Sequence, residues 1–212
     1  MTPPLAFWAF AGAYGLLFAV IEVFKRTTSI PATRTRKATH LGSALLSLGL
    51  PTYLEPHWIV LLSLSFTAVL FISKSQHILT SIHNVPRKTW GEVYFPLGIA
   101  LSAALVFWGP WTTGVDRDNA FQFGMLVLGL LDVAAELGGS LPSPTLWFGK
   151  TLSGSLSFML AGIMLFLACG LPFSPEMLAA VLGLTASESL LGRGLDNLAL
   201  PSLGAWAYLA IS

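Results

Sequence analysis

The chain has 212 residues, of which 54% are hydrophobic and only 10% are charged. Soluble domains carry about 25% charged residues, so this composition, with a mean hydropathy of +0.73, excludes a soluble globular enzyme, a disordered chain and a collagen-like fibre. The net charge of +1 gives no overall field for nucleic acid, and a single cysteine, Cys169, excludes a disulfide framework. Continuous apolar runs instead predict an all-α, polytopic integral membrane helix bundle, with residues 1–212 as a single transmembrane domain.

Eight segments are predicted to cross the membrane. In chain order they are 5–24, 40–54, 57–73, 95–111, 119–138, 152–171, 175–191 and 197–212. The second is short and contains Pro51, and the last two are only weakly apolar. The sequence therefore predicts seven or eight transmembrane helices and leaves a partly re-entrant arrangement open.

Basic residues divide unevenly between the two sets of connecting segments. Ten of the 11 Lys and Arg residues fall in the loops after the first, third, fifth and seventh segments, and only Arg117 falls on the other side. Loops rich in Lys and Arg face the cytoplasm. We therefore expect a multi-pass integral membrane protein with both termini outside and its basic loops inside.

Ionisable residues gather at one depth, near the cytoplasmic ends of the segments. Asp132 lies in an otherwise apolar stretch, about 9 Å from the inner end of its segment, and Glu136 follows at i+4 on the same helix face. An acidic residue inside a membrane segment is costly and usually faces the bundle interior or water. Glu22 is explained as well by pairing with a nearby Lys or Arg. The other members of this polar layer are His40, Glu92, Lys150, Glu188, Asp196 and Asn197.

The layer combines residue types that suit phosphoryl or nucleotidyl transfer. Carboxylates hold Mg²⁺ through oxygen ligands, and Lys and Arg bind polyphosphate oxygens. Gly149-Lys150-Thr151 is similar to the end of a phosphate-binding P-loop, but Pro144 stands where that motif needs glycine. Phosphoryl or nucleotidyl transfer is therefore indicated by the residue types of the polar layer taken together, and not by any motif of soluble enzymes.

Five ordered blocks, from about residue 34 to the C-terminus, resemble the polyprenol kinase family, which includes dolichol kinase, phytol kinase and the CTP-dependent diacylglycerol kinase. The blocks are Arg36-Lys37-x-x-His40, Arg87-x-x-x-Gly91-Glu92-x-x-Phe95-Pro96-x-Gly98, Asp132-x-x-Ala135-x-x-Gly138, Gly149-Lys150-Thr151-x-x-Gly154-Ser155, and Glu188 followed by Asp196-Asn197-x-x-x-Pro201. The resemblance implies a CTP-dependent kinase that phosphorylates a membrane-embedded lipid alcohol, and we favour a prenol such as phytol or a polyprenol.

Roles follow for the residues of these blocks as expectations. We assign catalysis to Asp132, Lys150 and Glu92, with Asp132 as the base or the group that positions the hydroxyl. Metal ligation is the alternative role of Asp132. The remaining candidates bind the nucleotide (Arg36, Lys37, His40, Arg87, Thr151 and Ser155) or a Mg²⁺ or other divalent cation (Asp196, Asn197, Glu188 and Glu136). The expected partners are the lipid alcohol, a nucleoside triphosphate and membrane lipids, without nucleic acid, and the active site is expected on the cytoplasmic side.

Ser153 departs from the pattern, because the family usually has Glu at this position. The missing carboxylate leaves open a shifted substrate, compensation by Glu136, or weak activity. Four alternatives therefore stay beside the prenol kinase: a phosphatidate cytidylyltransferase, a diacylglycerol kinase, a small membrane transporter and a non-catalytic family member.

Overall fold

The computed structural model describes residues 2–76, 78–83, 89–111 and 114–212, and these residues fold into helices with one isolated β-bridge. Four helices are long and apolar enough to cross a membrane: α1 (Pro3–Thr27), α4 (Pro56–Ser75), α6 (Gly91–Trp108) and the continuous helix Arg117–Gly139. This last helix is made of α7 (Arg117–Leu126), a π-helical turn η1 (Val127–Leu131) and α8 (Asp132–Gly139). The expectation of an all-α fold with apolar membrane-length helices is confirmed at this level.

The other helices are shorter. They are α2 (Ala32–Ser47), α3 (Leu50–Tyr53), α5 (Thr80–His83), η2 (Trp147–Gly149), α9 (Leu152–Ala168), α10 (Pro175–Leu190) and α11 (Asp196–Ile211). The second predicted segment, 40–54, differs most from what is observed. Its helix starts earlier, at Ala32, and ends at Ser47, and Pro51 lies in the first turn of the separate short helix α3. Proline lacks an N–H and fits only the first turn of a helix, so it divides this segment in two.

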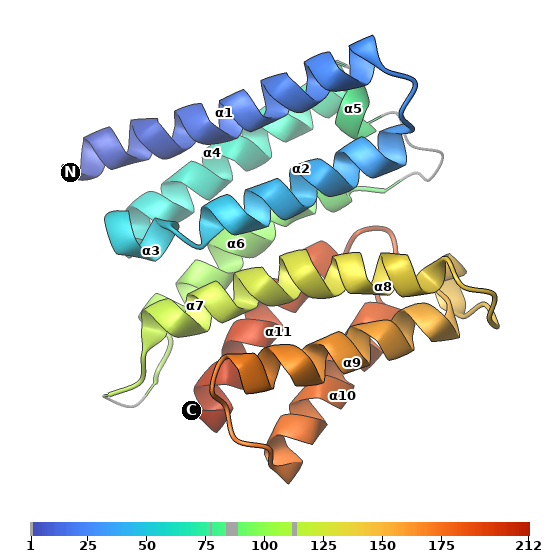
Figure 1. The fold of residues 1–212 in the computed structure, drawn as a ribbon. Coiled ribbons are helices and arrows are strands. Elements are labelled where there is room, and N and C mark those ends of the chain that lie inside the picture. Colours follow the sequence, from blue (N-terminus) through green and yellow to red (C-terminus); the bar gives the residue numbers. More distant parts are fainter. Residues whose placement is uncertain (1, 77, 84–88, 112–113) are drawn as a thin grey trace.

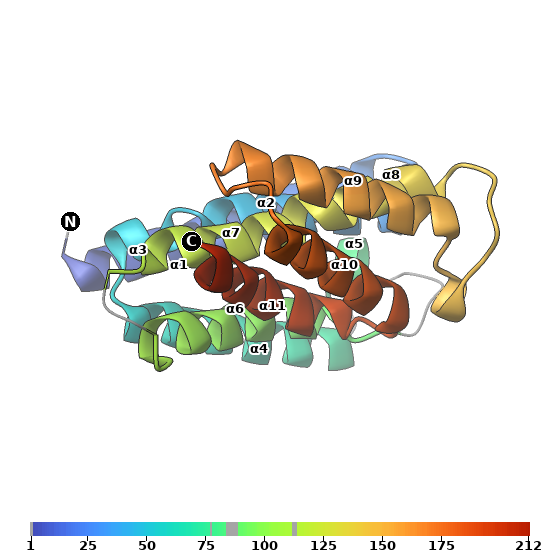
Figure 2. The same ribbon diagram turned by 90° about the horizontal axis from the view of Figure 1, so that it is seen from below.

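The long helices lie side by side, and because α2 returns the chain between them, α1 and α4 run in the same direction while α6 runs opposite to both (Figures 1 and 2). The loops that follow α1, α8 and α10 gather at one end of the bundle together with α5, whereas the N-terminus, α3 and the C-terminus lie at the other end (Figure 1). Apart from Arg117, the described Lys and Arg residues lie in the loops at the first end or in the helix turns next to them. Tertiary structure thus brings the basic segments together at a single end.

Glycines set the spacing of α11 from its neighbours. A Cβ atom on Gly98 of α6 would lie 2.3 Å from the carbonyl oxygen of Asn197, and one on Gly124 of α7 would lie 2.3 Å from the carbonyl oxygen of Pro201. Small residues allow helix backbones to approach this closely inside a membrane bundle. Because Asp196 begins α11, this packing also fixes a candidate site residue against α6 and α7.

The π-helical turn η1 immediately precedes Asp132. A single π turn inside an α-helix inserts an extra residue and turns the residues that follow it, and such turns are frequent at functional sites. At this turn the helix approaches α2 closely, since a Cβ atom on Gly129 would lie 2.6 Å from the Cβ of Ala44. The turn therefore places Asp132 beside the helix that carries Lys37 and His40.

Candidate functional site

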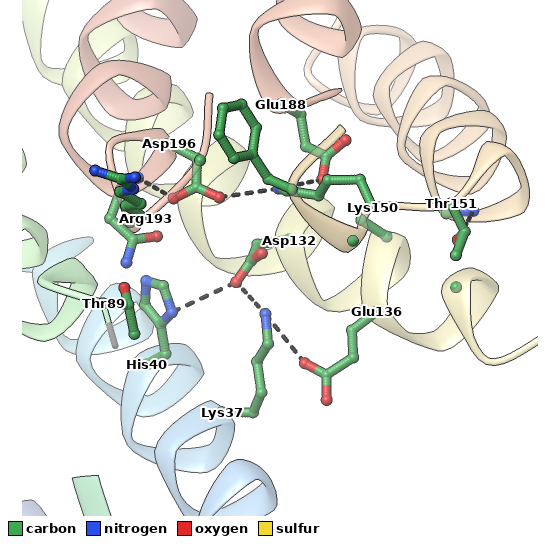
Figure 3. Close-up of a pocket in the computed structure, with 18 of the residues that line it drawn as sticks. Lys37, His40, Thr89, Asp132, Glu136, Lys150, Thr151, Glu188, Arg193 and Asp196 are labelled. Carbon is green, nitrogen blue, oxygen red and sulfur yellow. Dashed lines mark hydrogen bonds and ion pairs between the residues drawn. The ribbon is translucent and has the colours of Figure 1, made fainter. Parts of the chain in front are cut away.

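An open cavity of about 720 Å³ lies at the end of the bundle where the basic loops gather. Its walls come from α2, α8, the loop before α9, and the junction of α10 with α11 (Figure 3). Eleven of the thirteen candidate residues line it: Arg36, Lys37, His40, Asp132, Glu136, Lys150, Thr151, Ser155, Glu188, Asp196 and Asn197. The chain thus assembles one polar cavity from residues that lie up to 161 positions apart, between Arg36 and Asn197.

One group of side chains in the cavity centres on Asp132. Its Oδ2 accepts a hydrogen bond from Lys37 Nζ and lies 3.4 Å from His40 Nδ1. Lys37 Nζ also lies 3.1 Å from Glu136 Oε2. Contact of both acids with one lysine confirms that Asp132 and Glu136 share a helix face.

A second group centres on Lys150. Its Nζ donates to Glu188 Oε1 at 2.5 Å and to Asp196 Oδ2 at 2.9 Å. Burial disfavours the charged ammonium, but the carboxylates of Asp196 and Glu188 outweigh burial and raise the pKa of Lys150 above its ordinary value. Lys150 is therefore a fixed positive charge in the cavity wall.

The loop that presents Lys150 is a tight turn. The Leu146 N–H donates to the Lys150 carbonyl at 2.7 Å, and Thr151 caps α9 by accepting the Gly154 N–H at 3.2 Å. Phe148 and Gly149 adopt positive φ angles of 56° and 70° within this turn. A hydroxyl N-cap satisfies a backbone N–H that has no partner within the helix. Thr151 therefore stabilises the start of α9, in addition to its predicted contact with nucleotide.

Glu92 lies outside this cavity, unlike Asp132, Glu136, Glu188 and Asp196. It forms ion pairs with Lys74 and, at 3.2 Å, with Arg36. It borders a smaller pocket of about 40 Å³ that also contacts Arg36, His40 and Asn197. Glu92 thus holds Arg36 at the cavity wall, and its catalytic role stays a prediction. Arg87, the remaining candidate, lies outside the described residues.

The carboxylate of Glu22 makes structural contacts with neighbouring segments. It accepts from Arg26 Nε at 2.7 Å and from the Ser81 backbone N–H at 2.8 Å. The pairing interpretation of Glu22 is therefore the one observed. Glu22 holds α5 against α1 and does not reach the cavity.

Ser153, which departs from the pattern of the blocks described above, also does not line the cavity. Its hydroxyl lies 2.7 Å from Ser143 Oγ, and its N–H donates to the same Ser143 oxygen at 3.1 Å. These contacts tie α9 to the loop after α8. Serine thus serves as a local link at this position.

Sequence reasoning missed several residues of the cavity wall. Phe148 and Arg193 line it, as do Thr33 and Thr89. From the sequence, Arg193 is predicted only to be a basic loop residue. Its position between Gly192 and Gly194, close to Asp196, is the sequence feature that indicates a turn at the site. Phe148 rests on Gly192, where a Cβ atom would lie 2.4 Å from the phenyl ring. For Phe148, the sequence feature that indicates a place in the cavity wall is its position just before Gly149-Lys150.

The donor atoms suit Mg²⁺ that is shared with a bound nucleotide. The described residues contain no cluster of three His, Cys, Asp or Glu side chains placed to hold a metal alone. Mg²⁺ at nucleotide sites commonly takes one or two carboxylates and completes its shell with phosphate oxygens and water. Asp196 meets this requirement, because it borders the cavity at the start of α11 beside Glu188. Asn197 is less available, since its amide donates to the Gly91 carbonyl at 2.9 Å.

No protein-family model, curated protein or solved structure matches this chain.

Proposed function

We propose that this protein is a CTP-dependent lipid-alcohol kinase whose active site is the cavity between α2, α8, α9 and the start of α11. The observation that carries the proposal is the composition of the cavity wall. Arg36, Lys37 and Lys150 face the same space as four carboxylates, at the end of an apolar helix bundle. Phosphoryl transfer needs mainly positioning and charge neutralisation, and these residue types supply both.

The cations would bind the triphosphate. Lys37 and Lys150 each contact two carboxylates. Phosphate oxygens can take over one or more of these contacts, since charge-assisted hydrogen bonds to phosphate are strong. Arg36 adds a planar group that binds two oxygens at once. Asp196, with Glu188 beside it, would hold Mg²⁺, which when bound neutralises charge on the transferring phosphoryl group.

The acceptor would approach from the membrane. Asp132 lies about two turns before the end of α8, so in the proposed orientation it would be the side chain of the cavity wall that lies deepest in the membrane. We further propose that all eight helical segments cross the membrane, with α2 and α3 as one interrupted span, and that the basic end faces the cytoplasm. A hydroxyl at the inner headgroup level would then meet a nucleotide that arrives from the cytosol.

The test is a turnover assay with purified protein in nanodiscs. Phytol, geranylgeraniol, a long polyprenol and diacylglycerol are each supplied with Mg²⁺ and either CTP or ATP. We expect phosphorylation of a prenol with CTP, and a loss of at least two orders of magnitude in Lys150→Met. Lys25→Met is the matched control, because Lys25 lies at the same end of the bundle but outside the cavity wall. Cytidylyl transfer to phosphatidate without alcohol phosphorylation would refute the kinase proposal.

A further inference from the structure

His40 is held in a defined orientation from two sides. Its Nδ1 lies 3.4 Å from Asp132 Oδ2, and its ring meets the edge of Phe95 at a centroid distance of 4.3 Å and an interplanar angle of 77°. Phe95 comes from α6 and Asp132 from α8. The ring is thus held with Nδ1 facing the Asp132 carboxylate, which favours a proton on that nitrogen.

The second ring nitrogen, Nε2, is buried and has no hydrogen-bond partner among the described residues. It lies on the edge of the ring away from the contact with Asp132 (Figure 3). Buried polar atoms are nearly always hydrogen-bonded. A neutral imidazole that donates through Nδ1 presents a free acceptor at Nε2, so the geometry calls for a donor that is not part of the described protein.

The position of His40 indicates the chemical class of that donor. The residue borders the polar cavity and also the 40 Å³ pocket, whose wall includes Phe18, Leu70 and Phe95. These three residues also line an adjoining apolar pocket between α1, α2, α4 and α6. His40 thus stands where a polar space for phosphate meets an apolar space among membrane helices. A hydroxyl at the end of a hydrocarbon chain would match this boundary, with the hydroxyl at the polar side and the chain among the membrane helices.

We infer that His40 Nε2 receives the hydroxyl of the lipid substrate and acts as the general base of the transfer, while Asp132 holds the imidazole. This inference rests on the proposed kinase function. The hydroxyl proton passes to Nε2, and the freed oxygen electron pair forms a bond to the γ-phosphorus. The bond from that phosphorus to the β–γ bridging oxygen breaks, and the nucleoside diphosphate leaves with its electron pair. The proton on Nε2 is later released to solvent.

The assignment gives Asp132 a different role from the one that the sequence indicated. Both of its observed contacts are to side chains of α2, so it acts through His40 as a positioning residue. A carboxylate that orients an imidazole base is a recurrent arrangement in enzymes. Arg36, Lys37 and Asp132 act on the imidazole electrostatically, and Glu92 and Asp196 border the two pockets that His40 also lines.

The first test separates chemistry from nucleotide binding. His40→Gln retains a hydrogen-bonding side chain but cannot take up a proton. We expect the kcat for prenol phosphorylation to fall about 10²–10⁴-fold, with the Kd for Mg²⁺-CTP changed by less than threefold. Free imidazole should restore turnover to His40→Ala, which a purely structural histidine would not allow. His57→Gln is the control, because His57 is exposed at the start of α4 and far from the cavity wall.

Near-normal turnover of His40→Gln, or a loss that follows nucleotide affinity alone, would overturn the inference and leave the kinase proposal standing. The second test does not depend on turnover. A geranylgeraniol probe with a diazirine next to its hydroxyl is photocrosslinked to the wild-type protein and mapped by mass spectrometry. We expect labels on α2 and α6 around Thr39 and Phe95, lost in the presence of excess geranylgeraniol. Labels only on lipid-facing residues elsewhere would overturn the acceptor site. Labels at this site without any phosphoryl transfer would refute the kinase proposal and with it the role of His40 as a base, but would support the site as one that binds the lipid hydroxyl.

Discussion

Lys150 and Asp196 lie 46 residues apart in the chain and meet through a 2.9 Å contact between Nζ and Oδ2. The contact joins the loop before α9 to the first residue of α11, and Glu188 at the end of α10 completes it. One ammonium group thus fastens three segments of the cavity wall and is also the cation proposed to bind phosphate.

The dual role of Lys150 is testable by a double substitution. Removing one partner of a largely buried ion pair leaves an uncompensated charge, and commonly costs about 3–5 kcal/mol of unfolding free energy. We expect Lys150→Met to lower both stability and CTP affinity. Adding Glu188→Gln should recover part of the stability, because one stranded carboxylate is removed, but no affinity. Thermal unfolding in detergent and nucleotide titration measure the two effects, and joint recovery of both would contradict a role in phosphate binding.

The pH dependence of this ion pair has a definite sign. The pKa of Lys150 is raised above its ordinary value of 10.5. Its stabilising contribution is therefore complete below 10.5 and is lost as the pH rises through the higher pKa of the folded state. The difference in unfolding free energy between wild type and Lys150→Met should stay constant from about pH 7 to 10 and shrink above that range. A difference that declines already near pH 8 would show that the carboxylates do not hold Lys150 charged.

Asp132→Asn keeps the size of the side chain and removes its charge. We expect turnover to fall by at least two orders of magnitude while CTP affinity is largely retained, because Asp132 contacts α2 side chains. Single-turnover kinetics and equilibrium nucleotide binding on the same preparation provide the measurement. If affinity collapses and another divalent ion rescues it, Asp132 is a metal ligand, and normal turnover would remove Asp132 from the site.

Helix spacing should matter as much as charge. A methyl group on Gly98 would meet the Asn197 carbonyl oxygen at 2.3 Å, a backbone atom that cannot swing away. Gly98→Ala should therefore push α11 from α6, weaken nucleotide binding and lower the melting temperature by several degrees. Gly183→Ala in α10 is the matched control, since a Cβ atom there meets nothing within 4 Å, and it should be neutral or slightly stabilising. Equal melting temperatures for the two variants would contradict the close packing of α6 and α11.

The orientation in the membrane can be read from the single native cysteine. Cys169 is exposed at the end of α9, opposite the basic end of the bundle. A membrane-impermeant maleimide should label it in intact cells. In a Cys169→Ser background, Ser140→Cys, at the basic end after α8, should react only after permeabilisation. Labelling in the reverse pattern would place the cavity on the outer face.

The helix-anchoring role of Glu22 predicts an effect on structure without one on chemistry. Glu22→Gln weakens its contacts with Arg26 and with the Ser81 N–H. Hydrogen bonds to a charged group contribute about 1.5–3 kcal/mol, so the α5 segment should exchange its amide hydrogens faster. Mass-spectrometric hydrogen exchange reports this effect directly, and kcat per folded protein should stay within about twofold. Unchanged exchange in α5 would show that other contacts hold this helix.

The sequence by itself determined the helical class and the polar layer. Long apolar runs leave the backbone no partner but itself, which requires helices, and the i+4 spacing placed Asp132 and Glu136 on one face. Charge sorting along the chain was enough to indicate that the basic loops share one end. These features depend on local periodicity and composition, so no tertiary information was needed.

Only the tertiary structure decided which member of the layer contacts which. In it, Lys37 pairs with Asp132 and Lys150 pairs with Asp196. Glu92 lies outside the cavity and contacts Arg36, and His40 Nε2 is buried without a hydrogen-bond partner among the described residues. Such contacts depend on the rotation and spacing of helices that are distant in sequence. The π turn before Asp132 and the glycine contacts of α11 set that rotation and spacing, and neither is encoded in the hydrophobic periodicity of a single helix.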